Sequence, residues 1–185
     1  FASTFNSDAI QNIKLIKGAF PAQYGGRLSS VLDVTTREGS SEKFIGSLSL
    51  SNISSRFTIE GPLAEKSTYI LSARMMYLDK LLTLIPQADK FPRYGFYDAN
   101  GKISYNISET DKLFITGFFS SDQLSEPPAS KDIGFDIGWK NSTVNMTWTK
   151  IYSSQIFTST SLVYTYYDFK TAMKDKNPTK KDALD

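Results

Sequence analysis

The side chains that most often do chemistry in proteins are sparse in this chain. Its 185 residues contain no His and no Cys, which removes imidazole and thiolate metal ligands, thiolate nucleophiles and the Ser-His pair of hydrolytic enzymes. The carboxylates that come closest to a glycosidase-type acid-base pair are Asp132 and Asp136, and their flanking residues lack the features such a pair needs. The sequence therefore offers no catalytic, metal-binding or cofactor-binding residue, and we expect no enzyme.

The overall charge does not indicate a charged partner either. Lys and Arg number 21 against 19 Asp and Glu, and this formal net charge of +2 lacks the basic excess expected of a nucleic-acid-binding protein. The longest apolar runs fall far short of a membrane-spanning helix. Because the chain opens on Phe1 without a basic-then-apolar leader, we expect it to be a piece of a longer protein.

Alternating apolar and polar residues dominate the sequence from about Lys43 onward. Successive side chains of a strand point to opposite faces, so each such segment predicts a strand with one apolar and one polar face. In the clearest segment, one face holds Ser142, Val144, Met146 and Trp148 and the other holds Thr143, Asn145, Thr147 and Thr149. Aromatic residues near the predicted strand ends would suit interfacial girdles of a membrane barrel: Tyr69, Tyr77, Phe96, Tyr97, Trp139, Trp148 and Tyr164.

The predicted connections tend to alternate in length. Short turns are predicted at 61–66, 108–111 and 152–154, and long polar loops at 80–94, 122–135 and after Lys170. This asymmetry is typical of an up-and-down barrel of the outer-membrane kind. A soluble β-sandwich, a carbohydrate-binding or adhesive module, fits the same alternation but would bury its apolar faces. Segments as long as 154–170 favour the membrane barrel.

The first forty residues differ from the rest. A short helical turn is expected to open at Ser7 or Asp8, followed by a strand, the compact loop AFPAQYGG and a second strand over 28–37. The run 13–39 closely resembles the end of the plug domain of TonB-dependent outer-membrane receptors, where an A-x-Y-G-G loop and an L-S-S-V-x-x-V-T-T-R strand precede the barrel. Two later runs also resemble early barrel strands of the receptors that carry an amino-terminal carboxypeptidase-like regulatory domain: 57–63 and 69–79.

The resemblance implies an all-β fold in two parts. Residues 1–39 would be the carboxy-terminal part of a plug, and 40–185 about seven antiparallel strands of a transmembrane barrel that has about 22 strands in such transporters. The implied function is nutrient import, in which a ligand binds outside and a periplasmic TonB-type energy-coupling protein moves the plug. The implied setting is the outer membrane of a Gram-negative bacterium, with its lipid and a surface lipoprotein as further partners.

The same resemblance assigns roles to particular residues. The plug motif comprises Tyr24, Gly25, Gly26, Arg27, Ser29 and Ser30. Charged residues expected to face the barrel lumen are Arg56, Glu60, Arg74 and Lys102, which would either pair with plug residues or face water, and docking is favoured over substrate contact. Candidates for ligand contact in an external loop are Phe91, Arg93 and Tyr94.

Overall fold

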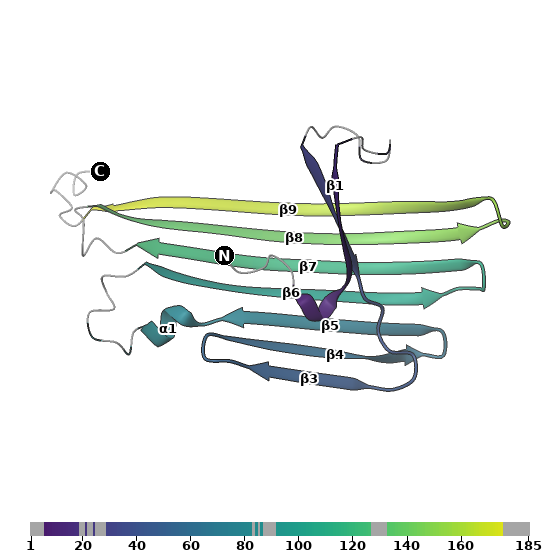
Figure 1. Cartoon of the computed structure of the whole chain (residues 1–185), viewed down its shortest axis with the longest axis horizontal. Coiled ribbons are helices and arrows are strands. Elements are labelled where there is room, and N and C mark those ends of the chain that lie inside the picture. The colour runs from purple at the N-terminus through teal and green to yellow at the C-terminus, as the bar shows by residue number, and fades with distance from the viewer. Residues whose placement is uncertain are drawn as a thin grey trace, which may run out of the picture.

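The computed structural model describes residues 6–18, 21, 24, 29–82, 84, 86, 92–126 and 133–175, without the side chains of Asp79, Ile133, Lys174 and Asp175. These residues form two antiparallel sheets (Figure 1). The smaller sheet pairs β1 (Ile10–Lys17) with β2 (Ser30–Thr36), and the 3₁₀ turn η1 (Ser7–Ala9) precedes it. Asn6 caps η1 by accepting a hydrogen bond from the Asp8 amide, so the predicted turn is confirmed with its cap one residue earlier than expected.

The larger sheet contains seven strands that neighbour each other in chain order. They are β3 (Ile45–Leu50), β4 (Ser54–Ala64), β5 (Ser67–Met76), β6 (Arg93–Asn106), β7 (Asp111–Glu126), β8 (Ile133–Ile151) and β9 (Phe157–Asp175). The short helix α1 (Leu78–Leu82) lies between β5 and β6, and in the described part of the chain no helix is long and apolar enough to cross a membrane. For the described residues, the prediction of an all-β fold with about seven antiparallel strands is confirmed.

The predicted connections were too long, because several polar segments are paired strand. Asp122 pairs with Trp139 inside β7 and β8, so the predicted loop 122–135 is wrong at both ends. The loop 80–94 likewise gives way to α1 and to β6 from residue 93, and β9 continues to residue 175. The predicted turn 61–66 shrinks to residues 65–66, and a register shift between Pro62 and Ala64 accommodates the proline.

The two faces of the larger sheet differ sharply in chemistry. On the apolar face, β8 presents Val144, Met146 and Trp148, all substantially exposed, as its alternation predicted. Other exposed residues on this face include Leu48, Phe57, Leu71, Met75, Tyr97, Ile103, Tyr105, Ile115, Leu162, Tyr164 and Tyr166. The opposite face, called the polar face below, carries the Ser, Thr, Asn and charged residues of β4 to β6 together with apolar residues such as Phe96, Phe114 and Trp139. An exposed apolar area of this extent indicates a surface that meets another apolar phase or partner.

The apolar side chains form a band that is limited along the strands. In β6 its ends are marked by Tyr97 and Tyr105, which together with the residues between them make nine positions. This matches the 9–11 residues of a tilted membrane-crossing strand. Of the aromatic residues expected in a girdle, Tyr97, Trp148 and Tyr164 lie on the apolar face, whereas register places Phe96 and Trp139 on the polar face.

Candidate functional site

The candidate site is the contact between the polar face and the amino-terminal unit, which we define as residues 6–18 and 29–37. Figure 1 shows β1 and β2 crossing the larger sheet, with η1 over its middle strands. The small apolar part of this contact places Ala9 and Ile70 in the interior, at 4% and 3% exposure. Most other contacts are polar, because alternation directs the hydroxyl, amide and charged side chains of β4 to β6 toward the unit.

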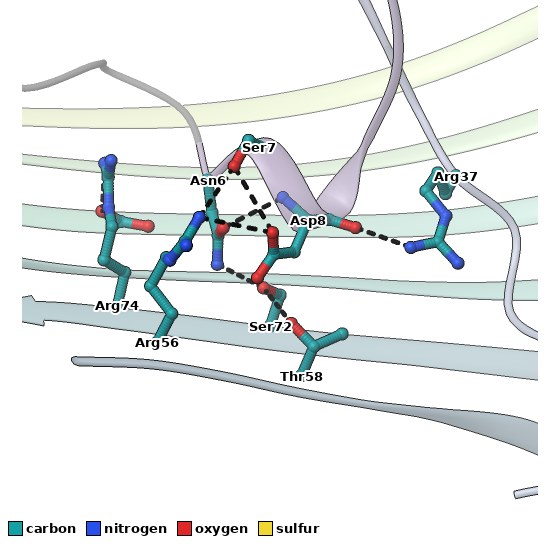
Figure 2. A network of polar contacts seen from close by, with 9 residues as sticks. Asn6, Ser7, Asp8, Arg37, Arg56, Thr58, Ser72 and Arg74 are labelled. Carbon is teal, nitrogen blue, oxygen red and sulfur yellow. Dashed lines mark hydrogen bonds and ion pairs between the residues drawn. The ribbon is translucent and has the colours of Figure 1, made fainter. Parts of the chain in front are cut away.

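A chain of three polar side chains fixes the beginning of the unit to the sheet (Figure 2). The Asn6 amide donates a short hydrogen bond to the Ser72 hydroxyl, which is 3.0 Å from the Thr58 hydroxyl. Asn6 and Ser72 are completely buried. Thr58 and Ser72 lie directly opposite each other on β4 and β5, so the register of these strands positions the Ser72 hydroxyl as the acceptor for Asn6. These hydrogen bonds anchor η1 beside the small apolar contact of Ala9 and Ile70.

Two arginines join the unit to the sheet from opposite directions. Arg56, on β4, donates to the Ser7 hydroxyl at 3.1 Å and lies 3.5 Å from the Asp8 carboxylate. Arg37, just after β2, contacts the Glu60 carboxylate at 2.7 Å and donates to the Asp8 carbonyl at 2.9 Å. The Glu60 side chain is 8% exposed and that of Arg37 40%, so this pair is partly shielded from water. Figure 2 shows Arg37 and Arg56 on either side of η1.

The predicted lumenal charges separate into two groups in the structure. Arg56 and Glu60 contact the unit as described, and the Lys102 ammonium donates to the Thr36 carbonyl at 3.1 Å while lying 4.8 Å from the centre of the Phe114 ring. Arg74 instead pairs with Asp98 on the neighbouring strand. Three of the four charges therefore dock the unit.

The Arg74–Asp98 pair belongs to the sheet itself. Arg74 contacts the Asp98 carboxylate through Nε at 2.8 Å and Nη2 at 2.6 Å, and its guanidinium lies 4.7 Å from the centre of the Phe96 ring. Both charged side chains are largely buried, at 11% and 2% exposure. The paired charges compensate each other within the polar face, and Phe96 contributes a cation–π contact.

The predicted ligand-contact residues do not converge on one site. Phe91 lies outside the described residues, and Arg93 and Tyr94 are the first two residues of β6 rather than loop residues. As consecutive strand residues they point to opposite faces. Tyr94 lies on the polar side and donates to the Asp122 carboxylate at 2.9 Å. Burial and this hydrogen bond raise the pKa of Tyr94 to about 12, so the phenol keeps its proton further into the alkaline range than an ordinary tyrosine.

The plug-motif residues are only partly described. Gly25, Gly26 and Arg27 lie outside the described residues, while the Tyr24 hydroxyl donates to the Asp33 carboxylate at 2.9 Å. Ser29 and Ser30 are exposed, and Ser30 pairs with Lys17 at the end of the β1–β2 ladder. This hydrogen bond connects Tyr24 to β2.

Two residues that hold the unit on the sheet, Asn6 and Arg37, were not among the site residues predicted from the sequence. Asn6 could have been found as the cap of the predicted turn, because Asn is among the preferred capping residues. Arg37 could be recognised as a charge at a strand end. Its pairing with Glu60 could not be predicted, because the pairing depends on how the unit lies on the sheet. Among the described residues, no group of three His, Cys, Asp or Glu side chains could hold a metal ion.

The fold and site together define an all-β protein whose up-and-down sheet holds a small amino-terminal unit on its polar face and leaves its apolar face bare in the described structure. Comparison with family models, curated proteins and solved structures gave no match to this chain.

Proposed function

We propose that this chain forms part of an outer-membrane receptor of the TonB-dependent class. The larger sheet would be a section of a barrel wall of about 22 strands, and the amino-terminal unit the end of the plug inside it. In this function a nutrient ligand binds outside, a periplasmic TonB-type coupling protein acts on the plug, and displacement of the plug opens a path. The resemblance of residues 13–39 to the family's plug end supports the assignment.

The observation that carries the proposal is which face the unit covers. In a soluble sandwich, the second layer packs against the apolar face, because burying that face supplies most of the stability. Here the unit packs on the polar face through Asn6, Arg37 and Arg56, while the apolar face remains exposed. An outer-membrane barrel requires this arrangement, with lipid outside and polar groups inside.

Two further features support the membrane interpretation. The apolar band has the length of a membrane crossing, and Tyr97 and Tyr105 lie at its two ends. Strand order is up-and-down throughout, with a long connection between β5 and β6 at one rim and the short turns 65–66 and 107–110 at the other. A sheet of this kind also leaves β3 and β9 without a second neighbour among the described residues, as expected for a section of a wall.

Adjacent residues of β8 provide a direct test. Val144 lies near the middle of the apolar band and is 52% exposed, whereas Thr143 points to the polar face. In the full-length protein, we expect Val144→Lys to reduce the folded, heat-modifiable form in the outer membrane, because a Lys at the bilayer midplane costs about 2–4 kcal/mol. Thr143→Lys is the matched control and should assemble nearly as well as the wild type.

The same two variants also test the alternative function, a soluble β-sandwich module. If the protein were a soluble β-sandwich module, it would fractionate without detergent. A membrane-embedded protein requires detergent and should lose assembly selectively with the Val144 substitution. Recovery of the wild type as a detergent-free soluble protein, or equal tolerance of both lysines, would exclude the proposed barrel wall.

A further inference from the structure

Aromatic side chains gather on the polar face toward the rim that holds α1, at the left of Figure 1. In one row across β6 to β9, register places side by side Phe96, Asp122, Trp139 and Phe169. Side chains directly opposite each other on neighbouring strands have Cβ atoms about 4.5–5.5 Å apart, so this row sets a carboxylate between two aromatic rings. Asp122 and Trp139 are partly exposed and Phe169 is 53% exposed, so the row presents aromatic surface to a molecule on this face.

The Asp122 carboxylate has a neutral partner in the described structure. The Tyr94 hydroxyl donates to one of its oxygens at 2.9 Å, and among the described residues Asp122 forms no ion pair. Tyr94, one of the residues predicted to contact a ligand, therefore orients this carboxylate without balancing its charge.

Charged side chains are few on the polar face of β7 to β9. By register, those with described side chains are Asp122 and Glu126 toward the α1 rim and Lys112 at the opposite rim. Alternation directs Lys140 and Lys170 to the other face, and the nearest cation across the sheet, Arg74, pairs with Asp98. Within the part of the chain that the structure describes, the polar face around Asp122 is thus negative.

The neighbouring Arg74–Asp98 pair shows which cation suits such a surface. The Arg74 guanidinium contacts the Asp98 carboxylate at 2.6 and 2.8 Å and lies 4.7 Å from the centre of the Phe96 ring. A guanidinium fits both partners, because its planar fork matches a carboxylate and its flat face stacks on an aromatic ring. Asp122 and Trp139 repeat this combination of carboxylate and ring, and no described side chain takes the place that Arg74 has beside Asp98.

We propose that Asp122, Trp139 and Phe169 bind a guanidinium group of the imported ligand. The carboxylate pairs with the guanidinium, the two rings stack on its flat face and on the methylene groups beside it, and Tyr94 holds Asp122 in position. The site selects a guanidinium over a neutral group of the same shape, because charge-assisted hydrogen bonds are about twice as strong as neutral ones.

The position of this site agrees with a role in uptake. Its row lies two rows beyond Ser72, where Asn6 anchors the amino-terminal unit, in the direction of the long connection between β5 and β6. This inference rests on the proposed function, which makes that rim the external one. A ligand that enters from outside then meets Asp122 and Trp139 before it reaches the unit.

The test measures binding to the full-length protein in a neutral detergent by isothermal titration calorimetry. The probes are N-acetyl-arginine amide and N-acetyl-citrulline amide, in which a neutral urea replaces the guanidinium. We expect the arginine derivative to bind about tenfold more tightly. Asp122→Asn should remove this preference while it keeps an oxygen acceptor for Tyr94, and Trp139→Leu should weaken binding of the arginine derivative by about threefold or more.

Two matched controls separate this site from general effects of charge and aromatic content. Asp168→Asn removes a carboxylate from the other face of the same part of the sheet. Trp148→Leu removes a tryptophan of the same strand from the apolar face. Both variants should keep the preference for the arginine derivative, and the heat-modifiable form of each variant shows that it has assembled.

Several outcomes would overturn the inference. These are equal binding or no binding of the two derivatives by the wild type, an unchanged preference in the Asp122→Asn variant, or tighter binding of maltose than of the arginine derivative, which would assign the aromatic row to a saccharide. A protein that requires detergent and passes the Val144 test, but shows one of these results, disproves the guanidinium site alone. A protein that fails the Val144 test disproves the proposed function.

Discussion

Replacing Arg37 with Met should loosen the amino-terminal unit from the sheet. The substitution keeps much of the side-chain volume but removes the guanidinium, and with it the contacts to the Glu60 carboxylate and the Asp8 carbonyl. Glu60 remains buried, and no other hydrogen bond or ion pair to its carboxylate is described. The cost therefore combines the lost ion pair to the sheet, the lost hydrogen bond to Asp8 within the unit, and a carboxylate left in a poorly hydrated position.

The size of this effect follows from the burial of the pair. Removing one partner of a fully buried ion pair costs about 3–5 kcal/mol, whereas fully exposed pairs contribute about 0–1 kcal/mol. Because the Arg37 side chain is 40% exposed and that of Glu60 8%, we expect about 2–4 kcal/mol for opening of the unit. Since 1.36 kcal/mol is a factor of ten, this corresponds to roughly 30- to 900-fold. Adding Glu60→Gln should recover about 1–2 kcal/mol, because the uncompensated charge disappears.

Native-state hydrogen exchange of the β1–β2 amides in the full-length protein measures this opening directly. The matched control is Lys14→Met, which removes an exposed cation from β1 of the same unit and should leave exchange unchanged. A double-mutant cycle with Glu60→Gln should give a coupling of at least about 1–2 kcal/mol, because the coupling is this recovery plus the cost of Glu60→Gln alone. A change of less than about threefold in β1–β2 exchange with Arg37→Met, or additive effects of the two substitutions, would show that the Arg37–Glu60 pair does not hold the unit.

Three further predictions concern single positions. Gly39→Ala should lower thermal stability by about 1–3 kcal/mol, because its Cβ would lie 1.9 Å from a backbone carbonyl oxygen of β5; Gly46→Ala, whose Cβ has 3.7 Å of space, should be neutral. Ser72→Ala should raise protease sensitivity of the unit by leaving the buried Asn6 amide without its acceptor, at about 1–3 kcal/mol. In a phenolate absorbance titration, Tyr94→Phe should remove a phase near pH 12; persistence of that phase would contradict the assignment. The stability from the raised Tyr94 pKa is present below pH 10.0 and is lost as pH rises through about 12.

Local alternation predicted the faces of the strands well, because side-chain direction in a strand depends on sequence position alone. The faces of β8 and the division between Ser72 and Leu71 in β5 follow this rule. Polarity predicted the strand ends poorly. Residues 120–126 are polar except for Leu124, yet their backbone remains paired with β8. This pairing depends on both strands together and cannot be predicted from either segment alone. The Arg37–Glu60 contact was hidden for a related reason, since it depends on the placement of one sheet on another.

The polar character of the interface explains how the unit could be held and still move in the proposed function. If apolar contacts held the unit, opening them would expose hydrocarbon to water at a free-energy cost of about 25 cal/mol per Å². The contacts of Asn6, Arg37 and Arg56 can instead be exchanged for hydrogen bonds to water, so each intramolecular bond contributes a net amount of only about 1 kcal/mol, or more where a charge is involved. A modest number of such contacts holds the unit at rest. A pulling force could break them one after another, and the polar face left behind would be compatible with a hydrated path.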